Sequence, residues 1–381
     1  MEYKRLGDYI KEINVRNRDL KVTKPMGINI DKHFMPSVAN VIGTDLSVYK
    51  LVSKNQFACN LMHVGRDEKI PMAMLTDDNP IIVSPAYLVF EIIQPKILMP
   101  EYLMMWFSRS EFDRNAWFYT DGDVRGGMDK EAFMDMQLPI PSITCQREIV
   151  SEYQTVEQRI QNNEQLIKKL EETAQAIYNH TFVEGIDEEN LPKGWRKDIL
   201  SSLGQTITGS TPSSDSPEDF GNQIMFLTPV DFHEYTKYIL STERCLSELG
   251  YNKLKNRSIP PYSVIVTCIG SDMGKVGINT SVCISNQQIN SIIPFKYFYT
   301  DYLYYCLNSK QELLKAYASG SSTMPLLNKS QFQNIEIVIP KEDILIKFSE
   351  SISKINNYMQ ILAKESNHLN SLLSLLTSKL S

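Results

Sequence analysis

Apolar residues recur at alternating steps of three and four in two stretches, one near the middle and one at the end of the chain. The first stretch comprises Val156, Ile160, Asn163, Ile167, Leu170, Ala174 and Ile177. The second comprises Ile355, Met359, Leu362, Ser366, Leu369, Leu373, Leu376 and Leu380. Asn163 and Ser366 are the polar interruptions of the two stretches, whose apolar register matches at an offset of 199. About four heptads of this spacing predict two helices of about 40 residues, roughly 60 Å long, packed along a coiled-coil seam.

A strand-like pattern precedes each predicted helix. FMDMQLPIP at 133–141 and FQNIEIVIP at 332–340 align without a gap at an offset of 199, and both alternate apolar with polar residues and end in proline. We expect each to be a strand that closes a domain. EYLMMWFSRS at 101–110 parallels DYLYYCLNSK at 301–310, and Leu6-Gly7 parallels Leu203-Gly204. The chain therefore uses one module of about 200 residues twice.

This repeat predicts an α+β fold with two similar mixed α/β domains, separated by two long helices and related by a pseudo-two-fold axis. The expected boundaries are a first domain at 1–141, a first helix at 142–183, a second domain at 184–340 and a second helix at 341–381. The acidic stretch 184–195 is the expected linker into the second domain, with Trp195 anchoring that domain's first strand. Because the first helix ends at the second domain and the second helix starts there, we expect an antiparallel coiled coil.

Composition limits the class of protein. Hydrophobic residues make up 42% of the 381 residues, which supports well-buried cores. The six cysteines form no C-x-x-C pair and are typical of reduced thiols. The N-terminus has no apolar leader, and the apolar stretch 81–93 is too short to span a bilayer, so we expect a cytoplasmic protein without membrane contact. A net charge of −6 argues against binding nucleic acid through bulk positive charge.

The order domain, helix, domain, helix, with I-x-I/V-P-type strands before both helices and LPKGW before the second domain, resembles the specificity subunits of type I restriction-modification enzymes. The resemblance covers essentially the whole chain. It implies that each domain is a target-recognition domain for one half of a split double-stranded DNA site, and that the helices set the gap. It also implies that two methyltransferase subunits dock on the helices and that restriction subunits join them for cleavage. The middle portions of the two domains differ, which indicates two different half-sites.

Catalytic motifs are missing from the sequence. A methyltransferase would show a glycine-rich cofactor loop and an Asn/Asp-Pro-Pro-aromatic loop, whereas Asp78-Asn79-Pro80-Ile81 is typical of a turn. The stretch 270–276 is one residue short of a phosphate loop and lacks its Ser or Thr. The five histidines show no metal-ligand spacing. We therefore predict no catalytic residue, no metal and no cofactor on this chain, and the resemblance places S-adenosylmethionine on the partner methyltransferase.

Residues that could contact DNA are basic or hydroxyl-bearing and lie in polar loops. In the first domain they are Arg16, Arg18, Lys24, Arg66, Lys69, Arg125 and Lys130. In the second domain they are Ser210, Thr211, Ser213, Lys253, Lys255, Arg257, Lys275, Ser321 and Lys329. Any single one is more often a solvated surface group, so the hypothesis concerns the sets. Arg125 and the run 321–323 precede the closing strand of each copy, which favours a shared DNA-facing loop.

Two alternatives stay open at this point. The tyrosine-rich run 297–305 could stack on bases, but its match with EYLMMWF on a predicted helix favours core packing. The whole chain could be a coiled-coil scaffold whose two domains bind proteins or peptides, which the acidic balance slightly favours. For the DNA-binding hypothesis, we expect a bipartite, asymmetric site with half-sites about 34–36 Å apart.

Overall fold

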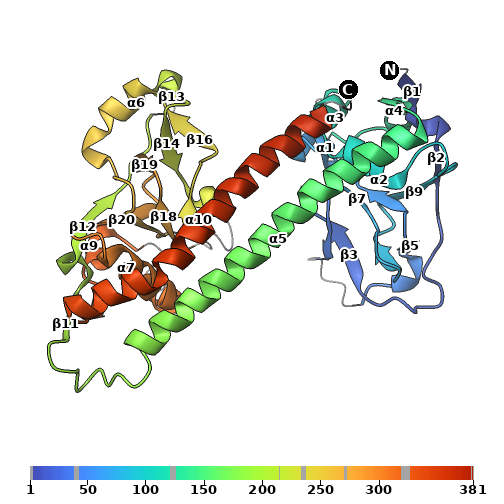
Figure 1. Ribbon diagram of the computed structural model, residues 1–381. Helices are drawn as coiled ribbons and strands as arrows, with labels where there is room; N and C mark the ends of the chain where they lie inside the picture. The colour runs from blue at the N-terminus through green and yellow to red at the C-terminus, as the bar shows by residue number, and fades with distance from the viewer. Residues whose placement is uncertain are drawn as a thin grey trace. The chain divides into compact units, whose positions relative to one another are not determined.

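The computed structural model describes residues 3–37, 43–120, 126–213, 215–232, 237–269, 273–318, 327–378 and 380. The chain divides into two compact units, residues 1–159 with 369–381, and residues 160–368. Both units mix small sheets with helices, and each contains part of α5 (Ile143–Phe182) and of α10 (Glu342–Ser378), the two long helices that the heptad spacing predicts (Figure 1). Within the described residues, no helix combines the length and apolar character that crossing a bilayer requires.

The first unit contains two four-stranded sheets. One has the order β2 (Ile10–Glu12), β9 (Leu88–Ile92), β6 (Phe57–Cys59), β7 (Met72–Met74), and the other β4 (Phe34–Pro36), β3 (Pro25–Ile28), β8 (Ile81–Val83), β5 (Lys50–Val52). The helices are α1 (Val64–Asp67), α2 (Pro100–Phe107), α3 (Ser110–Phe118) and α4 (Lys130–Asp135). Phe57 and Phe90 stack with ring centroids 5.0 Å apart, and the Phe107 ring meets both edge-on. These buried rings join the first sheet to α2.

The second unit contains a five-stranded and a four-stranded sheet. The first has the order β12 (Gly204–Thr208), β20 (Ile289–Pro294), β17 (Val264–Thr267), β18 (Val276–Asn279), β15 (Tyr238–Ile239). The second has the order β13 (Phe220–Gly221), β16 (Arg244–Leu246), β14 (Ile224–Leu227), β19 (Cys283–Ser285). The helices are α6 (Glu248–Lys253), α7 (Tyr299–Ser309), α8 (Gln311–Ala318) and α9 (Lys329–Gln333). Tyr302, Tyr304 and Tyr305 of α7 are buried, which confirms core packing for most of the tyrosine-rich run.

The repeat extends to individual hydrogen bonds. In the first unit, β1 (Tyr3–Arg5) pairs antiparallel with β10 (Gln137–Pro139), and the Tyr102 hydroxyl donates to the Pro139 carbonyl over 3.1 Å. In the second unit, β11 (Arg196–Ile199) pairs antiparallel with β21 (Glu336–Ile339), and the Tyr302 hydroxyl donates to the Val338 carbonyl. The two units therefore have equivalent closing strand pairs. In each unit, an equivalent tyrosine, from α2 or from α7, donates a hydrogen bond to the second strand of the pair.

Strand register corrects one predicted correspondence. The Leu6 amide donates to the Met136 carbonyl over 2.8 Å, and the Leu200 amide donates to the Ile335 carbonyl over 2.9 Å. Leu6 thus corresponds to Leu200, and the match of Leu6-Gly7 with Leu203-Gly204 was wrong. Short Leu-Gly pairs recur by chance, whereas backbone pairing admits one register.

The predicted closing strands were also too long. Phe133 and Phe332, where the pattern begins, are buried residues of the short helices α4 and α9. Side chains cap both helices: the Asp129 carboxylate accepts from the Glu131 amide over 2.9 Å, and the Asn328 side chain accepts from the Gln331 amide over 2.9 Å. These side-chain caps stabilise a short helix at residues where the apolar alternation predicted a strand.

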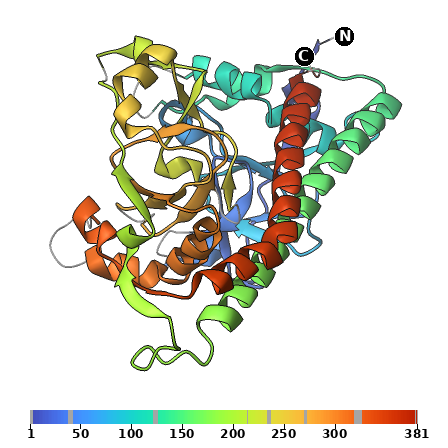
Figure 2. The ribbon, with the colours of Figure 1, turned by 60° about the vertical axis from the view of Figure 1, so that its left-hand side comes forward.

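In the second unit, α5 and α10 lie side by side (Figures 1 and 2) and run antiparallel. The Asn163 amide contacts Ser366, while the Tyr178 ring lies 6.1 Å from that of Phe348, so residue numbers rise along α5 as they fall along α10. In the first unit, Val156 shares a groove with Leu372 and Leu376 in the same direction. Every predicted seam residue is buried or half-buried: Val156, Ile160, Asn163, Ile167, Leu170, Ile177, Ile355, Met359, Leu362, Leu369, Leu373 and Leu376.

Candidate nucleic-acid interface

Two lysines of the first unit share one carboxylate, and an arginine lies beside one of them. Arg16 follows β2, forms a β-bridge with Lys50 and donates from its guanidinium to the Val48 carbonyl over 2.5 Å. Lys130, the first residue of α4, pairs with Glu12, and the Lys50 ammonium lies 4.0 Å from the same carboxylate. The local excess of positive charge is suited to a phosphate.

The electrostatics of Lys50 support this grouping. Its side chain is 8% exposed, and its ammonium donates to the Tyr87 carbonyl over 2.7 Å. Burial lowers the pKa of Lys50; Glu12 opposes that shift, while the nearby charges of Arg16 and Lys130 add to it. An added anion would relieve this repulsion.

Three loops meet in the second unit. The Thr211 hydroxyl, in the loop after β12, donates to the Gln287 side chain over 2.6 Å, and the Ser210 amide donates to the Ser285 carbonyl over 2.8 Å. Arg257 donates from its guanidinium to the Thr208 carbonyl over 2.7 Å. Ser210 and Thr211 therefore contact the turn that holds Gln287, a residue that sequence reasoning missed, and Arg257 contacts the end of β12. The only signal was the amide-rich run Asn286-Gln287-Gln288.

The predicted residues of the two domains occupy matching places. β2 pairs antiparallel with β9, and β12 pairs antiparallel with β20. The stretch 13–18 follows β2, and the stretch 209–213 follows β12. Lys130 and Lys329 each begin the short helix before the closing strand pair. Residues chosen separately from sequence thus fall on equivalent loops and helix starts.

Other predicted residues lie elsewhere. The Lys253 ammonium is 2.7 Å from the Asp219 carboxylate. Burial lowers the pKa of Lys32, and the carboxylate of Asp113 raises it. The charge of Lys69 also lowers the pKa of Lys32, so Lys69 lies near that buried lysine. Lys275 precedes β18, and its backbone N–H donates to the Thr267 hydroxyl over 3.0 Å. Arg18, Lys24, Ser213 and Lys255 are exposed. Arg125, Ser321 and the side chain of Arg66 lie outside the described residues.

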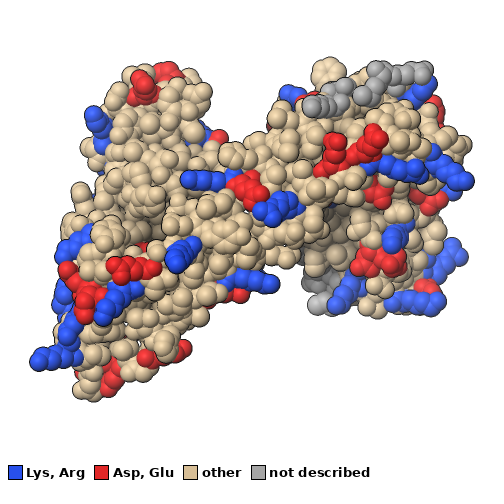
Figure 3. All heavy atoms as spheres, viewed as in Figure 1, with Lys and Arg blue, Asp and Glu red and all other residues tan. Residues whose placement is uncertain are grey.

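Charges of both signs intermingle on the molecular surface. On the face drawn in Figure 3, lysine and arginine side chains lie among aspartate and glutamate in each unit. That face has no continuous basic patch, in line with the net charge of −6. Among the described side chains, no group of three or more His, Cys, Asp or Glu is arranged to hold a metal ion.

A fully buried lysine of the second unit joins the domain to a long helix. The Lys237 ammonium lies 2.8 Å from the Asp301 carboxylate of α7 and 2.9 Å from the Asn356 side-chain oxygen of α10. It also lies 4.4 Å from the centre of the Tyr305 ring. Sequence reasoning missed this residue because a single lysine in an ordinary segment carries no pattern.

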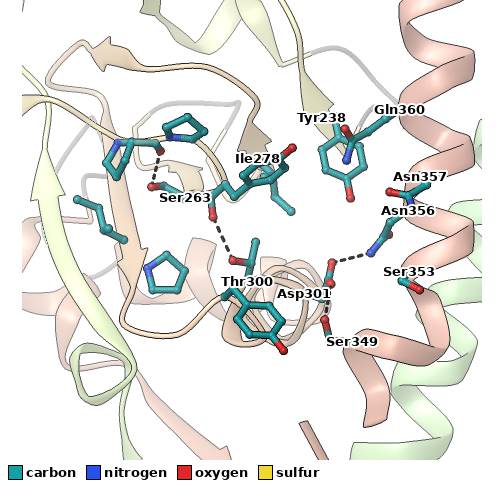
Figure 4. Close-up of a pocket in the computed structure, with 16 residues that line it drawn as sticks. Tyr238, Ser263, Ile278, Thr300, Asp301, Ser349, Ser353, Asn356, Asn357 and Gln360 are labelled. Carbon is teal, nitrogen blue, oxygen red and sulfur yellow. Dashed lines mark hydrogen bonds between the residues drawn. The ribbon is translucent and has the colours of Figure 1, made fainter. Parts of the chain in front are cut away.

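A groove of about 600 Å³ lies beside this lysine, between α10 and the sheet (Figure 4). Its lining includes Tyr238, Asp301, Ser349, Asn356 and Gln360, and no lysine or arginine among the described residues. The first unit has a groove of about 430 Å³ between α2 and α5, lined by Asp31, Lys32, Glu101, Glu157 and others. Neither groove is suited to a phosphate.

Comparison with known proteins identifies the second unit. Residues 192–371 match the family described as type I restriction modification DNA specificity domain. The chain is 36% identical over 167 residues, 43% of its length, to the type I restriction enzyme HindI specificity subunit of Haemophilus influenzae. It is 30% identical over 177 residues, 46% of its length, to the type I restriction enzyme MjaIX specificity subunit of Methanocaldococcus jannaschii. These matches span 36% and 40% of the two relatives' own lengths.

A solved structure matches the fold along the whole chain. The S subunit of a type I restriction-modification system from M. genitalium aligns with 100% of this chain and 95% of its own, with a TM-score of 0.56 and 11% identity. At that identity the likeness concerns the fold. Residues 192–371 are thus similar to the DNA specificity domain of type I restriction-modification enzymes, and the chain is similar in part to two of their specificity subunits.

Proposed function

We propose that the chain is the sequence-specificity subunit of a type I restriction-modification enzyme, which binds a bipartite, asymmetric site on duplex DNA and has no catalytic role of its own. One observation carries this proposal: the two units present equivalent loops with different chemistry. The loop after β2 offers Arg16 beside Lys50, which is also near Lys130. The loop after β12 offers Thr211 bonded to Gln287, and Arg257 contacts the last residue of β12. Equivalent loops favour one half-site each, and different side chains favour different half-sites.

The proposed division of labour follows the predicted boundaries. Residues 1–141 and 184–340 form the two target-recognition domains, and 142–183 and 341–381 form spacer helices that pair as a coiled coil with pseudo-two-fold symmetry. A rigid spacer would hold the half-sites about 34–36 Å apart, one turn of the double helix. The buried seams of α5 and α10 support a rigid pairing.

The proposed partners are two methyltransferase subunits, with restriction subunits for cleavage, acting in the cytoplasm on double-stranded DNA. S-adenosylmethionine would bind the methyltransferase, which flips the target adenine. The grooves beside α5 and α10 offer polar side chains for protein contacts. A net charge of −6 also favours a complex in which the partners contribute much of the phosphate contact.

The test is methylation-sensitive sequencing of DNA from cells that express the chain with its methyltransferase subunit. We expect methylation at a split motif that disappears without the chain. Exchanging residues 184–340 for the same region of a relative should change one half of the motif only. A change in both halves, or methyl transfer by the purified chain alone, would contradict the proposal.

The alternative function is a scaffold that binds proteins through its two units. The acidic groove of the first unit favours it, because Asp31, Glu101 and Glu157 suit a basic peptide. Band-shift assays with the methyltransferase subunit present distinguish the two functions. A scaffold would give equal shifts for random and cognate duplexes at moderate salt.

A further inference from the structure

The turn 285–288 of the second unit is locked to the loop 209–213 by direct backbone contact. A Cβ atom at Gly209 would lie 2.1 Å from the Ser285 carbonyl oxygen and 2.2 Å from that of Asn286. The Gly209 amide donates to the Ile289 carbonyl over 3.2 Å, next to the Ser210–Ser285 hydrogen bond. Only glycine permits this approach. The two segments therefore form one rigid platform, as precise recognition requires.

Hydrogen bonds single out Gln287 within the turn. The Asn286 Oδ1 accepts from the backbone N–H of Gln288 over 3.0 Å, and the Asn286 Nδ2 donates to the Gln288 Oε1 over 3.1 Å. Asn286 and Gln288 are therefore hydrogen-bonded to each other. Gln287 is exposed, and Thr211 orients it by donating to its Oε1. An amide oxygen accepts two hydrogen bonds, so Oε1 retains one acceptor position and Nε2 keeps its donors for a ligand.

Positive charge lies at the end of β12, where the loop that holds Thr211 begins. The guanidinium of Arg257 is oriented by the Thr208 carbonyl and is exposed to solvent. Because that bond uses one N–H, four other donors can bind an anion. The same loop thus has an oriented guanidinium at its start and an oriented carboxamide bonded to Thr211, and these two groups suit a backbone phosphate and a base edge.

We propose that Gln287 reads an adenine in the half-site bound by the second unit, while Arg257 binds an adjacent phosphate. In the major groove, Oε1 would accept from the adenine N6 amino group and Nε2 would donate to N7. Guanine would place an acceptor, O6, against Oε1 and be rejected. This inference rests on the proposed function and adds to it the base and the residue.

The equivalent turn of the first unit has no oriented glutamine. That turn, Ser84–Tyr87 before β9, contains no amide side chain, and Arg16 is the long polar side chain of the neighbouring loop. The adenine preference due to a glutamine is therefore confined to one half-site, the one read by the second unit.

The experiment compares methylation motifs written by complexes of the chain with its methyltransferase subunit, for the natural chain and for Gln287→Ala and Gln287→Glu. We expect Gln287→Ala to lower discrimination at one position of one half-site on the order of tenfold. Gln287→Glu should shift that position toward cytosine, because a carboxylate accepts from the cytosine N4 amino group. The other half-site should not change. Gln223→Ala, an exposed amide between β13 and β14, is the matched control and should leave the motif unaltered.

A second variant tests the platform itself. Gly209→Ala keeps Gln287 but forces the two segments apart, so the same position should lose discrimination while thermal unfolding shows that the chain is folded. An unchanged motif in both Gln287 variants would overturn the inference and leave the proposed function standing. If the natural chain writes no sequence motif at all, the proposed function fails and the inference with it.

Discussion

The Asn163 Nδ2 lies 3.4 Å from the Ser366 hydroxyl oxygen, so the polar interruptions of the two heptad stretches face each other. The same nitrogen lies 3.0 Å from the Glu365 carboxylate. Asn163 is 2% exposed and Ser366 8%, in a seam that is otherwise apolar. A buried polar pair of this kind selects one register of the helices at a cost in stability.

The double variant Asn163→Leu with Ser366→Ala should therefore raise the melting temperature by a few degrees, because apolar packing replaces a polar contact. It should also weaken register, which broadens the resonances of α5 and α10 in methyl NMR spectra. Asn162→Leu, one position along on the exposed side of α5, is the control. A lower melting temperature in the double variant than in the natural chain would show that the polar pair contributes net stability.

Lys237→Met should destabilise the second unit by about 3–5 kcal/mol, because it leaves the Asp301 carboxylate without its buried cation. Urea denaturation measures this loss. Lys237→Met with Asp301→Leu should recover part of it, since the Asp301 carboxylate is then no longer left without its cation. Lys296→Met is the control: it removes a lysine paired with Glu342 at the surface and should cost much less stability, because solvent screens the pair. If Lys237→Met and Lys296→Met lowered the free energy of unfolding equally, burial of the Lys237 ion pair would have no special role.

Glu171→Gln should stabilise the chain increasingly as pH rises from 5 to 8. Burial raises the pKa of Glu171, with the charge of Lys237 opposing, and its Oε1 has no hydrogen-bond partner. A carboxyl group whose pKa is higher in the folded state contributes most at low pH, and that contribution is lost as pH rises through the folded pKa. Glutamine keeps the acceptor for the Tyr305 hydroxyl without the charge. Melting temperatures across this range are the measurement, with exposed Glu172→Gln as the control; parallel curves for the two variants would contradict the expected coupling.

Lys130→Ala and Lys329→Ala should each weaken DNA binding similarly for cognate and random duplexes, because both helix-start lysines are proposed phosphate contacts. Each should reduce the slope of log K against log salt by about 0.9 in fluorescence anisotropy titrations of the complex with its methyltransferase subunit. Lys54→Ala removes an exposed lysine that pairs with Asp78 and is the control. A variant that alters the preferred sequence instead would indicate a base contact.

Much of the fold was predictable because local periodicity and duplication are properties of the chain itself. The heptad spacing identified α5 and α10, and the offset of 199 identified the strands β10 and β21 before them. Missing catalytic motifs and the duplicated order indicated the family. Lys130 and Lys329 could be chosen from sequence because each lies at a fixed place in the repeat.

Only the tertiary structure decided what distant segments do together. Gln287 lies 76 residues from Thr211, and Lys237 lies 119 residues from Asn356, so no local pattern could pair them. The backbone register that matched Leu6 with Leu200 likewise depends on strand pairing across a whole unit. The sequence determined which elements form and that they occur twice, because helix and strand periods are local. The sites depend on long-range packing, and the facing of Asn163 and Ser366 across two helices is one instance: both were recognisable as interruptions, and their contact required the fold.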